Sequence, residues 1–163
     1  MSAPDGGAHD RHPLPEEAAA LVEALGLEPL EHEGGLFRQT YVDEFSTAIY
    51  FMVARPDFSA LHILSGAEGY FWHAGSPLEL LLLHPDGTGE QRVLGPDVAA
   101  GQQFQTVVPG GIWQGSSPRG DWSLVSTTMA PGFDWEGFRL GECAELSREY
   151  PAHSARIGEL TRG

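Results

Sequence analysis

The chain has 163 residues, of which 23 are acidic and 9 basic, and its formal net charge is −14 at pH 7. All nine basic residues are arginine, so chemistries that need a lysine amine, such as Schiff-base catalysis or a Walker-type phosphate loop, are excluded. An acidic chain also lacks the basic face that neutralises nucleic-acid phosphates or binds an anionic membrane, so we expect neither partner.

Length and composition indicate one globular domain, since domains typically span about 100–200 residues. Cys143 is the only cysteine, which excludes an internal disulfide and a CxxC site. Apolar runs such as Leu80–Leu83 are far shorter than the roughly 20 residues of a membrane span, and the polar N-terminus does not resemble a secretory signal. We therefore expect a cytoplasmic protein with a flexible arm at 1–13 and a single domain at 14–163.

The first predicted element is a helix at about 15–25. Pro15 suits the first turn, and the two glutamates after it favour the positive end of the helix dipole. Leu21 and Leu25 lie on one apolar stripe, and Gly26 is placed to end the helix in a left-handed conformation.

After this helix, short apolar or alternating runs are separated by turn residues, a pattern that predicts strands. Turn sequences such as Pro85-Asp86-Gly87 mark the connections. Two weak helical patterns follow, at 143–149 and around 154–161. Many short strands at spacings of about 8–12 residues predict an all-β sandwich or barrel. The nine predicted strands are 36–42, 46–54, 59–64, 68–74, 77–84, 90–94, 104–109, 112–115 and 122–130.

Two residues stand out as candidates for chemistry. His62 lies on a predicted strand where Ala60, His62 and Leu64 share one face, and Glu68 begins the next strand. Both side chains can then reach the same barrel interior, as metal ligands or as an acid/base couple. The alternative is that His62 is a structural residue with satisfied hydrogen bonds.

A tight turn at Pro109-Gly110-Gly111, followed by Trp113 and Gln114, completes a pattern that resembles the cupin superfamily. Cupin motifs place two histidines one residue apart, then a glutamate and a glycine, and a last histidine after a Pro-x-Gly turn. On this sequence those positions are, in order, Ala60, His62, Glu68, Gly75 and Gln114.

Within the superfamily, the chain resembles the DUF985 (cupin-5) family. This resemblance implies a double-stranded β-helix, or jelly-roll barrel, with a short N-terminal helix and short C-terminal helical segments. It also implies a small-molecule pocket inside the barrel and a homodimer. The stretches that carry it are Glu33–Tyr41, Ser46–Tyr50, His73–Leu80, Arg92–Asp97, Val108–Gly115 and Ala130–Asp134.

The departures from the superfamily pattern concern a metal. Cupin metal sites typically use three histidines and a glutamate, but Ala60 supplies no ligand here and Gln114 offers only an amide. If a divalent metal is present, His62, Glu68 and Gln114 would hold it. Because transition-metal sites normally need about three strong protein ligands, we expect no metal and no other cofactor. His73 is predicted to point to the opposite face from Glu68.

Without a metal, the same residues can transfer protons. An aromatic pocket would desolvate Glu68 and raise its pKa, and His62 beside it would titrate near neutral pH. We expect them to act on a small, partly apolar metabolite, with Arg38 available for an anionic group. The predicted substrate-binding residues are Arg38, Tyr50, Tyr70, Trp72, Trp113, Gln114, Ser126 and Thr128.

Three functions therefore stay open at this point. The first is a metal-independent isomerase, cyclase or lyase that uses His62 and Glu68. The second is a metal-dependent cupin oxygenase or isomerase with Fe, Mn, Ni or Zn. The third is a small-molecule-binding protein without catalysis.

Overall fold

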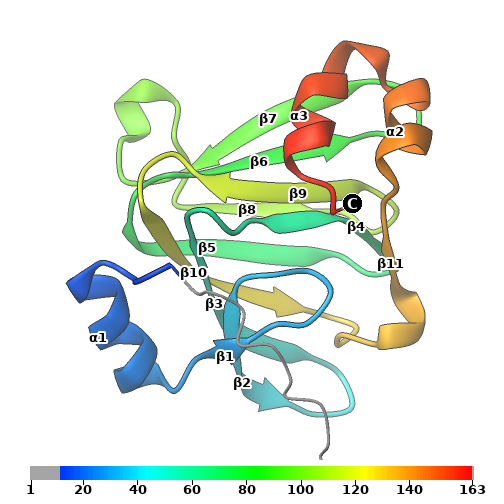
Figure 1. The fold of residues 1–163 in the computed structure, drawn as a ribbon. Helices are drawn as coiled ribbons and strands as arrows, with labels where there is room; N and C mark the ends of the chain where they lie inside the picture. Colours follow the sequence, from blue (N-terminus) through cyan, green and yellow to red (C-terminus); the bar gives the residue numbers. More distant parts are fainter. Residues whose placement is uncertain (1–11, 163) are drawn as a thin grey trace, which may run out of the picture.

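The computed structural model describes residues 12–162, and its named strands pair into two antiparallel sheets that face each other (Figure 1). The six-stranded sheet has the order β1 (Glu28–Pro29), β2 (Leu36–Val42), β3 (Thr47–Ala54), β10 (Trp122–Met129), β5 (Glu68–Gly75) and β8 (Gln105–Val108). The five-stranded sheet has the order β11 (Phe138–Leu140), β4 (Ser59–Leu64), β9 (Trp113–Pro118), β6 (Leu78–Leu83) and β7 (Gly89–Leu94).

Helices cover the outer faces of both sheets. Helix α1 (Glu16–Leu25) ends at Gly26, whose left-handed φ of 65° forms the expected C-cap. Its apolar side packs on the outer face of the six-stranded sheet. Helices α2 (Cys143–Glu149) and α3 (Ser154–Glu159) lie over the five-stranded sheet (Figure 1). Within the described residues, no helix has the length and apolarity needed to cross a membrane.

These elements confirm the predicted all-β jelly roll with an N-terminal helix and short C-terminal helices. Each predicted strand corresponds to an observed one, with ends that differ by up to three residues. Strands β1 and β11 were not predicted, because two and three residues are too few to show alternation. The three single-turn 3-10 helices, Val98–Ala100, Trp135–Gly137 and Pro151–His153, were not predicted either. Residues 1–11 of the predicted arm lie outside the described part of the chain.

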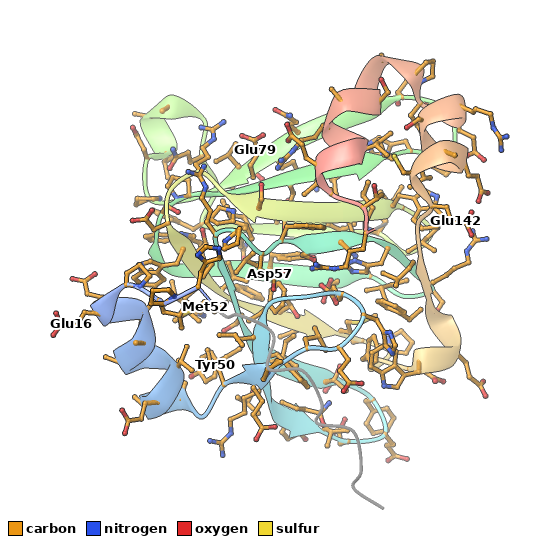
Figure 2. The ribbon with its side chains drawn as sticks, viewed as in Figure 1. Glu16, Tyr50, Met52, Asp57, Glu79 and Glu142 are labelled. Atoms are coloured by element: carbon orange, nitrogen blue, oxygen red, sulfur yellow. The ribbon has the colours of Figure 1, made fainter. Side chains whose placement is uncertain are left out.

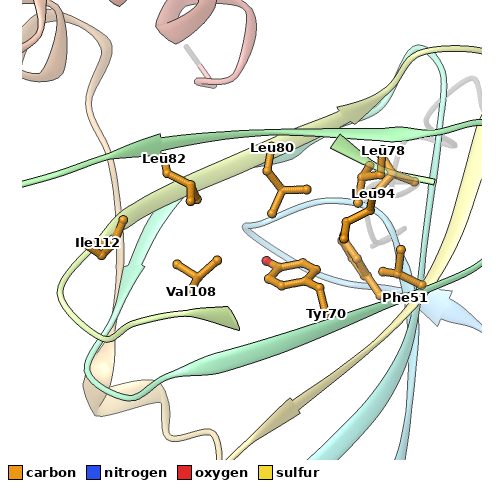
Figure 3. Close-up of a cluster of buried hydrophobic side chains, with 10 residues drawn as sticks. Phe51, Tyr70, Leu78, Leu80, Leu82, Leu94, Val108 and Ile112 are labelled. Carbon is orange, nitrogen blue, oxygen red and sulfur yellow. The ribbon is translucent and has the colours of Figure 1, made fainter. Parts of the chain in front are cut away.

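Strand β6 explains the longest leucine run of the sequence, Leu80–Leu83, because both of its faces are buried. Leu78, Leu80 and Leu82 point between the sheets, where they meet Tyr70 and other apolar side chains (Figure 3). Leucines at the alternate positions, 81 and 83, point the other way and pack beneath α2 and α3. A strand covered on both sides is expected to have an uninterrupted apolar sequence.

Candidate functional site

A cavity of about 700 Å³ lies between the two sheets, beside the leucine-rich core. Both sheets contribute to its wall, together with the segment between α1 and β2 and the loop after β10. Its lining is a mixture of acidic, hydroxyl and apolar side chains, and it has the size of a small-molecule site. The lining residues are Gly26, Glu28, Leu30, Glu33, Phe37, Arg38, Gln39, Thr47, Ile49, Phe51, His62, Leu64, Glu68, Tyr70, Thr127, Met129, Phe133 and Trp135.

His62 is fixed in the cavity wall by its backbone neighbour. The side chain is buried in β4, and its Nδ1 lies 2.7 Å from the carbonyl oxygen of Ala60. Because a carbonyl only accepts hydrogen bonds, the proton of the neutral ring is assigned to Nδ1. The Nε2 atom is then unprotonated and can accept a proton. Phe138 stacks on the imidazole, with ring centroids 5.4 Å apart, and this contact fixes the ring plane.

Glu33 lies close to this histidine and was not predicted as a site residue. It occupies the turn between β1 and β2, and its Oε1 accepts a hydrogen bond of 2.7 Å from the Ser59 hydroxyl. The same oxygen is 3.8 Å from Nε2 of His62. A residue in an irregular turn gives no periodic signal in the sequence. The sequence signal that could have identified Glu33 is its position at the start of the Glu33–Tyr41 stretch, which resembles the DUF985 family.

Glu68, at the start of β5, faces the same cavity and is buried. Burial raises the pKa of its carboxyl group above the ordinary value, and the negative charge of Glu33 raises it further. The charge of His62 and the neighbouring hydroxyl groups of Thr127 and Tyr70 lower it by less. The environment therefore favours the protonated carboxylic acid more than water does, as the sequence predicted for a desolvated Glu68.

Tyr70 connects Glu68 to the five-stranded sheet. Its hydroxyl donates a short hydrogen bond to Oε1 of Gln114, a buried residue that pairs with His62 across β4 and β9. Burial raises the pKa of the phenol well above its usual value, and the charges of Glu68 and Glu33 act in the same direction. The phenol is thus a neutral donor, and the Gln114 amide supports it from behind the cavity wall rather than lining the cavity.

Three predicted substrate-binding residues point away from the cavity. Tyr50 packs in the cluster beneath α1, on the outer side of the six-stranded sheet (Figure 2). Ser126, the strand partner of Tyr50, hydrogen-bonds the exposed His73, and Thr128 is exposed. The prediction placed the wrong set of alternate β10 residues inside the barrel. Thr127, rather than Ser126 and Thr128, lines the cavity. The outward direction of His73 agrees with the prediction.

The two predicted tryptophans also lie outside the cavity lining. Trp72 packs against the core between the sheets, and its Nε1 donates to the carbonyl of Ser76. Trp113 is buried beneath α2 and α3, with the Arg139 guanidinium 5.0 Å from its ring centroid. The Pro-Gly-Gly turn directs Gln114 inward, and alternation then sends its neighbour Trp113 outward.

The aromatic side of the cavity comes instead from the segment after β10. Phe133 and Trp135 line the cavity and meet edge to face, with ring centroids 4.9 Å apart. Trp135 also contacts Phe138, which stacks on His62. Trp135 is exposed, so this aromatic group reaches from the imidazole to the protein surface.

Arg38 is among the lining residues of the cavity, but it is exposed and pairs across β2 and β3 with Tyr50, whose side chain lies on the outer sheet face. One guanidinium nitrogen donates to the carbonyl of Leu25 over 3.3 Å. Within residues 12–162 no carboxylate lies within 4.0 Å of this guanidinium, so none of its donors is engaged by an acidic side chain there.

The donor set does not fit the metal site that the superfamily pattern implies. The part of the chain that the structure describes holds no group of three His, Cys, Asp or Glu side chains arranged to bind an ion. The oxygen of Gln114 already accepts the Tyr70 hydroxyl proton, and Ala60 contributes no ligand atom. Only His62 and Glu68 remain of the expected ligands, fewer than a transition metal usually requires.

Comparisons with known proteins agree with this architecture. A protein from Shewanella oneidensis of known structure is 33% identical, with a TM-score of 0.84, over 89% of this chain and 97% of that one. A hypothetical protein from Leishmania major is 28% identical, with a TM-score of 0.82, over 90% and 99%. An uncharacterized protein of Saccharomyces cerevisiae is 27% identical over 76% of each chain.

The family model described as the Cupin superfamily (DUF985) matches residues 19–141, a range that contains all the named strands from β1 to β11. More distantly, a cupin 2 conserved barrel domain protein from Rhodopseudomonas palustris shares the fold, at 16% identity and a TM-score of 0.59 over 84% and 90%. The chain therefore belongs to the DUF985 family of the cupin superfamily.

Proposed function

We propose that the protein is a metal-independent acid/base enzyme of the isomerase, cyclase or lyase type. The observation that carries this proposal is that His62 and Glu68 line one cavity. Nε2 of His62 is free to accept a proton, and burial raises the pKa of the Glu68 carboxyl group above its ordinary value. Pairs of titratable groups whose environments separate their protonation states are typical of acid/base sites.

In the proposed reaction, Nε2 of His62 removes a proton from a carbon next to a carbonyl group of the ligand. The Glu68 acid donates a hydrogen bond, or its proton, to the carbonyl oxygen as negative charge develops there. The nearby Glu33 carboxylate stabilises the imidazolium that forms, since opposite charges attract strongly away from water. Return of the proton to a different carbon or face completes an isomerisation, and loss of a leaving group completes a lyase reaction.

The rest of the cavity suggests the kind of ligand. Phe37, Ile49, Phe51 and other apolar side chains would contact a hydrocarbon or planar body. Arg38 would bind a carboxylate at the other end of the molecule, because its guanidinium has few internal partners. We therefore propose a small, partly apolar metabolite with a carbonyl group and one anionic group.

Proton exchange provides a test that does not require the substrate to be identified first. Purified protein is incubated in D₂O with a small-molecule cell extract, and mass spectrometry detects metabolites that gain deuterium. We expect His62→Gln and Glu68→Gln each to slow the labelling by about 10²- to 10⁴-fold, the usual contribution of a general acid or base. Matched controls are His73→Gln on the outer sheet face and Glu44→Gln in an exposed loop.

Different results identify the competing functions. Equal labelling by wild type and both site variants would show that His62 and Glu68 are not the catalytic pair. A metabolite that co-purifies with the protein but is never labelled or converted would favour a binding protein. Stoichiometric Fe, Mn, Ni or Zn in protein purified without an affinity tag, with labelling lost on chelation, would favour the metal-dependent function.

A further inference from the structure

Three arginines converge around a second, smaller hollow of about 170 Å³. Arg55 follows β3, Arg119 follows β9, and Arg156 belongs to α3, so three separate parts of the chain bring them together. Glu79 on β6 and Ser117 on β9 complete the lining with Pro118 (Figure 2 labels Glu79). The hollow shares no lining residue with the large cavity. Arg55 of the hollow follows the last residue of β3, whereas the large cavity includes Thr47, the first residue of that strand.

The charges around this hollow do not balance. Glu79 accepts a hydrogen bond of 2.9 Å from Nε of Arg119, and its other oxygen lies 3.9 Å from Arg156. Arg156 also pairs with Glu159, whose side chain is mostly exposed. Arg55 has no carboxylate within 4.0 Å in the described part of the chain. Three guanidinium groups thus meet two carboxylates, in a protein whose net charge is −14.

Several guanidinium donors are also unused. Arg55 donates through Nη2 alone, to the carbonyls of Pro118 and Arg119. Arg156 donates through Nη1 to Glu159 and through Nη2 to the Ser117 hydroxyl, at 2.7 Å. Its Nε is buried and has no hydrogen-bond partner within residues 12–162. A buried donor without a partner costs about 1–3 kcal/mol, so an acceptor at this point would be stabilising.

We infer that this arginine cluster is a binding site for a small oxyanion, a carboxylate or a phosphate group. Guanidinium groups match the planar or tetrahedral oxygen arrangement of these anions and bind them with paired hydrogen bonds. The hollow, at about 170 Å³, is several times larger than the roughly 30 Å³ that one water molecule occupies, which leaves room for one such group. The bound anion would link α3 to the ends of β3 and β9.

Thermal unfolding and titration calorimetry of the full chain test this site with sodium phosphate and sodium acetate as separate probes. Sodium chloride at equal ionic strength is the reference, because salt alone reduces repulsion in an acidic protein. We expect one of the two oxyanions to raise Tm by a few degrees more than chloride does, and to bind with measurable heat. The probe that binds more tightly identifies a phosphate or a carboxylate as the ligand group.

Variants locate the binding. Arg119→Gln and Arg55→Gln should each weaken the affinity at least tenfold, whereas Arg148→Gln, an exposed arginine on α2, should leave it unchanged. If Arg55→Gln does not fold, the affinity of Arg55→Lys is measured in its place, because lysine keeps the positive charge but lacks the guanidinium group. The inference is overturned if neither oxyanion exceeds chloride for the wild type. It is also overturned if Arg148→Gln weakens binding as much as the cluster variants do, since the effect would then be one of net charge.

Discussion

The space between the two sheets has a filled region and a hollow one, and the two differ in the side chains that β-strand alternation sends inward. In the filled region β6 contributes leucines that meet Val108, Val125 and Phe51 (Figure 3). In the hollow region β4 and β5 contribute His62 and Glu68, and about 700 Å³ stays open beside them. Close packing in the filled region stabilises the fold. This stabilisation offsets the free-energy cost of the partly desolvated polar groups in the hollow region.

Tyr70 lies at the boundary between these regions. Its ring belongs to the leucine cluster, and its hydroxyl reaches Gln114 at the polar end. The comparison predicts that substitutions in the filled region cost mainly stability, and that substitutions in the hollow region change ionisation and chemistry.

The largest stability effect is expected from Leu82→Ala. Leu82 is fully buried, so removal of its side chain leaves a cavity and should lower the free energy of unfolding by about 2–5 kcal/mol. Urea unfolding at pH 7 measures this change. Val98→Ala, at an exposed position, should stay within about 0.5 kcal/mol of the wild type. A small effect of Leu82→Ala would mean that this region is not close-packed.

A smaller effect is expected at the boundary, from Tyr70→Phe. The variant removes the donor to the buried Gln114 amide and should destabilise the protein by about 1–3 kcal/mol. The double variant Tyr70→Phe/Gln114→Leu removes both partners and should recover most of that loss. A double-mutant cycle in urea measures the coupling, and additive losses would contradict the proposed link.

The smallest change in the free energy of unfolding is expected from Glu68→Gln, and this change should be stabilising. The folded-state pKa of Glu68 is raised, so its favourable contribution is complete below the unfolded value of 4.5 and is lost as pH rises through the folded pKa. Glutamine cannot ionise, so the variant should gain stability relative to wild type as pH rises above 4.5 and through the raised pKa of Glu68. Urea unfolding across this range measures the difference. A difference that is constant with pH would contradict the raised pKa.

The fold could be predicted from the sequence because its signals are local. Turn residues and alternating or continuous apolar positions located nine strands. The DUF985 motifs then indicated the arrangement of those strands.

The candidate site could be predicted only in part. Motif spacing placed His62 and Glu68 in the cavity lining, and Tyr70 and Arg38 lie there as well. Tyr50, Ser126 and Thr128 were misplaced because strand parity depends on register, which a single sequence does not fix. Glu33 was missed because it lies in a turn, and Trp135 because it lies in a single-turn 3-10 helix. Neither segment gives a periodic signal, and their contacts depend on chain regions far away in the sequence.

The origin of the cavity wall has a consequence for how this protein can diversify. Much of the rim comes from two segments, residues 26–39 and 133–135, that precede and follow most of the strands in the chain. The filled leucine region takes few residues from either segment. Ligand preference can therefore be changed by substitutions near the two ends of the domain, while the residues that drive folding stay as they are. Single substitutions suit this purpose better than exchange of whole segments, because residues 26–39 include β1 and part of β2 in the six-stranded sheet.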